Sequence, residues 1–133
     1  MIGIANIFRI CGVLHIFITL GLFVSIFASA DIWLPDGATA DHIATGKILS
    51  GLILSHGIGI GVILLLSSFI KDVSSAKKIL LGEIVLSICI LVAFIYNTFL
   101  LDSWYSSPPI VIWVVTAVLI LLSIYGRFKV NRM

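Results

Sequence analysis

The sequence predicts an all-α polytopic membrane protein: one domain, built as an antiparallel four-helix transmembrane bundle with both termini in the cytoplasm. Three observations support this prediction. Of the 133 residues, 61% are hydrophobic and only 11% are charged, and the mean hydropathy is +1.28, whereas a soluble domain carries about 25% charged residues. Charged residues divide the chain into apolar stretches of membrane-spanning length. The positive charges also gather at one side of those stretches.

Four apolar stretches have the length that a membrane span needs. A hydrocarbon core about 30 Å thick takes roughly 20 residues of helix. The stretches between charged residues cover 10–30, 48–70, 79–101, in which Glu83 alone is charged, and 103–126. We therefore expect spans at about 8–30, 44–70, 76–101 and 108–127. No polar linker interrupts the pattern, so residues 1–133 form a single domain.

The connecting segments carry turn and capping residues. Pro35-Asp36-Gly37 is typical of a turn, and Asp41 is a candidate N-cap for the second helix. Ser74 and Ser75 are candidate caps for the third. Ser107-Pro108-Pro109 suits a cap followed by first-turn prolines at the start of the fourth. Because the connections are short, neighbouring helices are expected to run antiparallel.

The first span also has some features of a secretory signal peptide. Arg9, an apolar run and Ala28-Ser29-Ala30 before Asp31 resemble a signal sequence with its cleavage site. The apolar run, however, is longer than a signal-peptide core usually is. We therefore interpret this segment as the first transmembrane helix.

Lysine and arginine predict the orientation in the membrane. Seven of the eight lie on the side of the termini and of the connection between the second and third helices, and Lys47 alone lies on the other. The side rich in cations is expected to be cytoplasmic, in a bacterial inner (plasma) membrane. The opposite side carries an acidic rim and an aromatic belt, formed by Asp31, Asp36, Asp41, Asp102, Trp33, Trp104 and Tyr105.

Three ionisable side chains fall inside the spans and are functional candidates, because a charge in the membrane is costly. At about 1.5 Å per residue from the nearest cytoplasmic cation, His15 lies about 9 Å deep, Glu83 about 7 to 8 Å and His56 about 22 Å. His15 and Glu83 thus share a level, where Ser123 or Tyr125 of the fourth span can join them. Such a pair can act as a proton site or as the polar end of a ligand cavity. The sequence favours a structural role, in which the pair holds two helices together and Glu83 is shallow enough to reach the head groups or Lys78.

His56 lies in the glycine-rich stretch Ser55–Gly61 of the second span, at the level of Asn97 in the third. Gly57 and Gly61 form a small-xxx-small pair, which lets a neighbouring helix backbone approach closely. The partner helix can belong to this chain or to another. Glu83, Ser87 and Asn97 form a polar stripe that indicates either interior packing or a narrow polar path.

Several classes of function have no support in the sequence. His15 and His56 differ by about 13 Å in depth, so they do not suit a haem with two histidine ligands, and His15 with Glu83 supplies too few ligands for a metal. No catalytic residues are identified, because motifs for nucleotide binding, metalloproteases or acyl-transfer nucleophiles are absent from the sequence. The small net charge of +2 gives no reason to expect nucleic-acid binding. The two cysteines lie within apolar spans and are expected to be buried, inert thiols.

The order of elements, together with Ser55-His56-Gly57 in the second span, resembles the small four-helix DoxX-like bacterial membrane proteins. That resemblance covers most of the chain and implies a lipophilic partner such as a quinone. Small multidrug transporters are a second four-helix comparison. They place their essential glutamate in the first helix, whereas this chain has Glu83 in the third, so their mechanism does not carry over.

The sequence favours a non-catalytic bundle that serves as an accessory subunit of a larger membrane complex or binds a lipophilic ligand. Its expected partners are membrane lipids, other membrane-protein subunits or further copies of the chain. No cofactor is predicted, although a lipid or quinone would fit. Two alternatives stay open: a small proton-coupled transporter or channel using Glu83, and an intramembrane enzyme acting on a lipid-soluble substrate.

Overall fold

A computed structural model describes residues 2–28, 37–99 and 109–133. Within these residues the chain forms four helices: α1 (Ile4–Ala28), α2 (Ala40–Ser67), α3 (Val73–Phe99) and α4 (Ile110–Lys129). Each is long and apolar enough to cross a membrane. At 1.5 Å per residue their lengths run from about 30 to about 42 Å, against a hydrocarbon core of about 30 Å.

The helices begin within four residues of the expected spans, at residues 4, 40, 73 and 110 instead of 8, 44, 76 and 108. α1 begins at Ile4 instead of residue 8, since the chain's last residues pack against its start: the Ile4 N–H donates to the Arg132 carbonyl over 3.0 Å. α4 begins at Ile110, directly after its N-cap Pro109. Of the capping tripeptide expected there, Ser107 and Pro108 lie outside the described residues.

Two capping predictions were wrong by a few residues. Thr39, not Asp41, is the N-cap of α2, and its hydroxyl accepts the His42 N–H over 3.3 Å. Asp72, not Ser74 or Ser75, caps α3: its carboxylate accepts the backbone N–H groups of both serines, over 3.3 Å and 2.7 Å. In each case the capping residue is the one that lies just outside the first helical turn, where its side chain reaches the free N–H groups. Gly37 has a φ of +84°, as a turn at this place requires.

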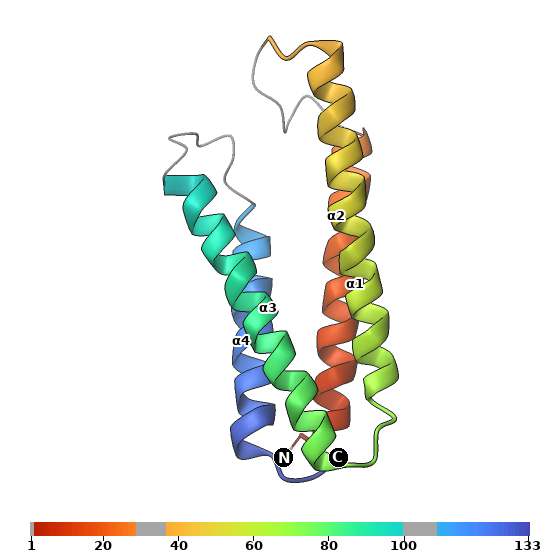
Figure 1. The fold of residues 1–133 in the computed structure, drawn as a ribbon, viewed down its shortest axis with the longest axis vertical. Helices are drawn as coiled ribbons and strands as arrows, with labels where there is room; N and C mark the ends of the chain where they lie inside the picture. Colours follow the sequence, from red (N-terminus) through yellow and green to blue (C-terminus); the bar gives the residue numbers. More distant parts are fainter. Residues whose placement is uncertain (1, 29–36, 100–108) are drawn as a thin grey trace.

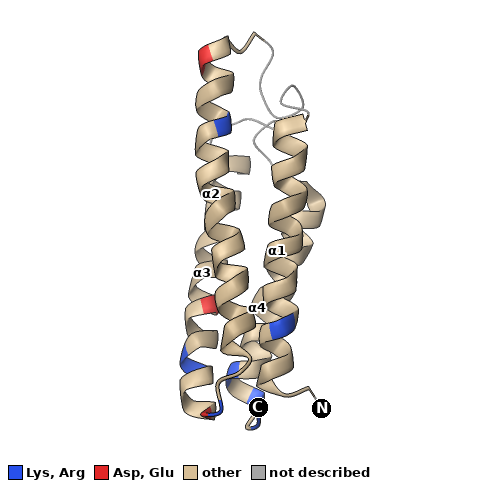
Figure 2. Cartoon of the chain, turned by 90° about the vertical axis from the view of Figure 1, so that its right-hand side faces the viewer, with Lys and Arg blue, Asp and Glu red and all other residues tan. Residues whose placement is uncertain are grey.

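The helices pack as two pairs, α1 with α2 and α3 with α4, and the pairs meet mainly through α1 against α4 and α3. Both chain termini and the connection between α2 and α3 lie at one end of the molecule, and toward the other end the two pairs diverge (Figure 1). We call these the closed end and the open end. Most lysines and arginines of the described chain lie at the closed end (Figure 2).

The apolar core lies at the closed end. It joins residues of all four helices and of the C-terminal segment, and its members are buried to at least 96% of their surface: Ile4, Ile7, Phe8, Cys11, Leu64, Ala76, Leu80, Leu119 and Val130. The aromatic pairs farther along stay within one helix or one helix pair, as Phe23 on Phe27 and Phe94 on Trp113 show.

Candidate functional site

A buried polar cluster lies where the two helix pairs meet. His15 Nε2 of α1 lies 2.8 Å from Glu83 Oε1 of α3, and the Ser87 hydroxyl, one turn farther along α3, donates to the same oxygen over 3.1 Å. All three residues are at least 95% buried. The sequence placed His15 and Glu83 at one level, and the structure brings them into direct contact.

The local sequence explains this geometry. Glu83 and Ser87 stand four residues apart, so their side chains lie one above the other on one face of α3. His15 lies four residues beyond Cys11, on the face of α1 that enters the core. A buried carboxylate without partners would cost several kcal/mol, and the two contacts to Oε1 offset that cost.

The other predicted partners of the pair do not bond to it. Ser123 is fully buried on α4, but its hydroxyl has no hydrogen-bond partner among the described residues; the Cys11 thiol near it is only a weak hydrogen-bonding group. Tyr125 is half-buried and packs against the apolar core instead. The described residues also contain no group of three or more His, Cys, Asp or Glu side chains that could hold a metal ion.

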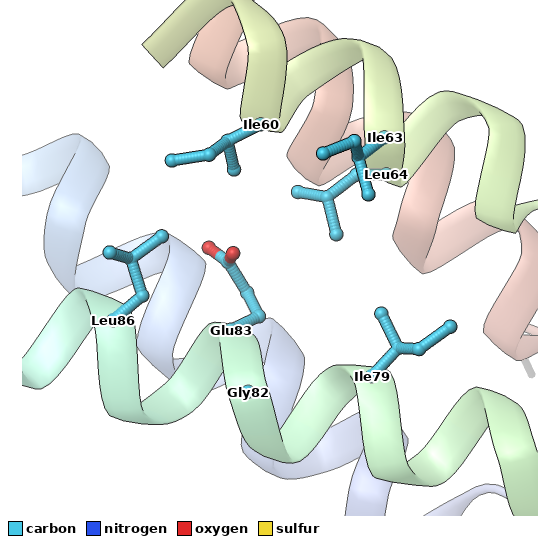
Figure 3. Close-up of a pocket in the computed structure, with 7 residues that line it drawn as sticks. All are labelled: Ile60, Ile63, Leu64, Ile79, Gly82, Glu83 and Leu86. Carbon is cyan, nitrogen blue, oxygen red and sulfur yellow. The ribbon is translucent and has the colours of Figure 1, made fainter. Parts of the chain in front are cut away.

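An apolar pocket of about 260 Å³ lies between α2 and α3 beside the cluster. Ile60, Ile63 and Leu64 of α2 face Ile79 and Leu86 of α3 across it, and the Glu83 carboxylate points between them (Figure 3). Gly82 also lines the pocket, and a Cβ added there would meet no atom within 4 Å. The pocket therefore has apolar walls, one carboxylate and an unobstructed position at Gly82.

His56 does not belong to this site. Its side chain is exposed on α2, and Nδ1 lies 2.7 Å from the Leu52 carbonyl of its own helix. Asn97 is half-buried near the far end of α3. The polar stripe expected on α3 thus forms a contact only between its first two members, Glu83 and Ser87.

Gly57 and Gly61 form the expected packing seam, and α1 is the helix that uses it. A Cβ on Gly61 would lie 2.8 Å from the Gly12 carbonyl oxygen, and a Cβ on Gly57 would lie 2.5 Å from the Thr19 hydroxyl. Gly12 and Thr19, the α1 residues that meet this seam, were not predicted from the sequence. Their spacing of seven residues, which places two small side chains on one helical face, is the signal that could have identified them.

The cysteines differ from one another. Cys11 is fully buried in the apolar core, as expected, whereas Cys89 is exposed on α3, so the prediction of a buried thiol was wrong there.

Comparisons with protein-family models, with curated proteins and with solved structures found no match to the chain. The resemblance to DoxX-like proteins therefore stays a prediction.

Proposed function

We propose that the chain crosses a membrane four times as an antiparallel bundle and binds a lipophilic molecule in the pocket between α2 and α3. One observation carries this proposal: a buried carboxylate, fixed by His15 and Ser87, faces an apolar pocket of about 260 Å³. Binding sites for small molecules commonly combine apolar walls with a few fixed polar groups. The DoxX-like resemblance, which implies a lipophilic partner, points the same way.

The orientation of the bundle in the membrane is part of this proposal. Seven of the eight lysines and arginines lie near the termini or in and near the connection between α2 and α3, which supports a cytoplasmic closed end. Impermeant amine-reactive labels applied from outside the cell should then spare Lys71, Lys77 and Lys78. Modification of these lysines in intact cells would reverse the orientation.

Native mass spectrometry from mild detergent tests ligand binding directly. We expect the protein to retain a lipophilic molecule, and Gly82→Leu to lose it, because the new side chain occupies the pocket. Gly59→Leu is the matched control: Gly59 also has no atom within 4 Å of an added Cβ, but it does not line the pocket. Equal retention in both variants, or none in the wild type, would contradict the proposal. The same spectra test the predicted role as an accessory subunit, which requires other subunits to copurify.

A second candidate function is proton-coupled transport, favoured by the direct contact between His15 and Glu83. Imidazole and carboxyl groups can both exchange a proton, and Glu83 lines the pocket. In proteoliposomes, Glu83→Gln should abolish a proton-coupled flux while the helical content is preserved. An unchanged flux would eliminate this candidate.

A further inference from the structure

We propose that the pocket selects a lipophile whose head group donates a hydrogen bond, such as a long-chain alcohol, and that Glu83 Oε2 is the acceptor. This inference rests on the proposed binding function and specifies the chemical class of its ligand. Both hydrogen-bond contacts of the Glu83 carboxylate go to Oε1, and within the described chain Oε2 has no partner. Figure 3 shows the carboxylate directed into the space between α2 and α3.

The two contacts at Oε1 define what the other oxygen can do. The Ser87 hydroxyl donates to Oε1, and His15 Nε2 lies at hydrogen-bonding distance from it. A carboxylate oxygen accepts about two hydrogen bonds, so Oε1 is occupied. Oε2 is then a fixed acceptor with free capacity, and His15 and Ser87 act as positioning residues for it.

The rest of the pocket provides no competing polar group. Its other lining side chains are Ile60, Ile63, Leu64, Ile79 and Leu86, and Gly82 has no side chain. A head group with only acceptor atoms would face the carboxylate oxygen without a hydrogen bond. A donor satisfies the oxygen, and a hydrogen bond to a charged group is worth about tenfold or more in affinity.

Size and position indicate how such a ligand is held. The volume of about 260 Å³ is slightly below the range of about 300 to 1,000 Å³ that encloses whole drug-sized ligands. The pocket thus accommodates a head group and the first carbons of a chain. Ile63, which lines the pocket, is 60% exposed on a helix long and apolar enough to span a membrane. The remaining tail therefore lies along lipid-facing surface, and the ligand arrives sideways from the bilayer.

A matched set of photoreactive lipids tests the inference on the wild-type protein in vesicles. The probes are a long-chain alcohol with a diazirine near its head, its methyl ether and the corresponding ketone, and labelled residues are mapped by mass spectrometry. We expect the alcohol to label 60–64 and 79–86 about tenfold more than the ether or the ketone. Unlabelled alcohol should compete. Glu83→Leu should reduce alcohol labelling to the level of the ether, and Gly82→Leu should remove it without altering Glu83.

The outcomes separate the two proposals. Equal labelling of the pocket by all three probes, removed by Gly82→Leu, would leave the binding function intact and overturn the head-group inference. Preference for the ketone would show that Glu83 donates instead of accepting, and would also overturn it. Absence of labelling at the pocket, or labelling that Gly82→Leu does not change, would overturn both.

Discussion

The closed and open ends of the molecule are built differently from similarly apolar sequence. At the closed end, α1 contributes Ile4, Ile7 and Phe8, all fully buried in a core shared by the four helices. Toward the open end the same helix exposes Val24 at 64% and Phe27 at 42%, and the helix pairs diverge (Figure 1). Apolar character therefore does not determine where helices pack. In a membrane, an exposed apolar side chain loses nothing against lipid, so helix association depends on close van der Waals packing, which small residues permit, and on polar contacts.

Among the contacts that distinguish the closed end from the open end, the one between His15 and Glu83 is expected to contribute most to the free energy of unfolding. His15→Leu would leave the buried Glu83 carboxylate without its partner on α1, which is expected to destabilise the protein by about 3 kcal/mol or more. Unfolding in mixed detergent and lipid micelles measures the loss. Replacing both residues together, as His15→Leu with Glu83→Leu, should cost less than His15→Leu alone, since it removes the unpaired charge. A double variant less stable than His15→Leu would show that the unpaired Glu83 carboxylate is not the source of the loss.

The next largest loss of stability is expected from a substitution in the glycine seam between α1 and α2. Gly61→Ala places a Cβ 2.6 Å from Ile16 Cγ1 and 2.8 Å from the Gly12 carbonyl oxygen, so the helices must separate at a cost of about 1–3 kcal/mol. Gly59→Ala is the control, because an added Cβ there meets nothing within 4 Å. The same unfolding assay should show a loss for Gly61→Ala alone. Equal stability of the two variants would mean that the seam is not closely packed.

Substitutions at two buried serines are expected to have smaller effects on the free energy of unfolding, and the two effects differ. Ser87 donates to Glu83, so Ser87→Ala should cost about 1 kcal/mol. The Ser123 hydroxyl has no partner among the described residues, so Ser123→Ala should leave the unfolding free energy unchanged or raise it. Loss of stability in Ser123→Ala would reveal a hydrogen bond to that hydroxyl.

The sequence determined positions along the helices better than rotations about them. Charges spaced by about one membrane thickness located all four helices, and depth counted from the cations brought His15 level with Glu83. Depth alone also associated His56 with Asn97. The exposed His56 instead bonds to its own helix, because the rotation of α2 is fixed by Gly57 and Gly61 packing on α1.

The pocket could not have been predicted from the sequence. It depends on how far α2 lies from α3, two helices that are adjacent in the chain but belong to different packed pairs. Its residues, apart from Glu83, are ordinary isoleucines, leucines and one glycine. Such residues acquire a role only from the arrangement of the helices around them.

The smallest expected effect lies at the exposed start of α3. Hydrogen bonds from the Ser75 side chain and from the backbone N–H groups of Ser75 and Ser74 lower the pKa of Asp72 below its ordinary value of 3.8. Because the folded pKa is lowered, the cap stabilises the helix start fully above about pH 4 and loses this effect as the pH falls through the folded pKa. Amide exchange of residues 74–76 should accelerate, relative to its intrinsic rate, on that acidification. Asp72→Asn, which keeps a capping oxygen but does not titrate, should remove the pH dependence; if it persists, Asp72 is not its source.

Distances between spin labels at the two ends test the central contrast most directly. One pair of labels is attached at Leu66 of α2 and Phe128 of α4, at the closed end. The other is attached at Ile48 of α2 and Ile110 of α4, at the open end. All four side chains are at least 63% exposed, so labels there do not disturb the core. With both native cysteines replaced and the protein in lipid nanodiscs, we predict a narrow distance distribution for the closed pair and a broader one for the open pair. Equally narrow distributions at both ends would contradict the account.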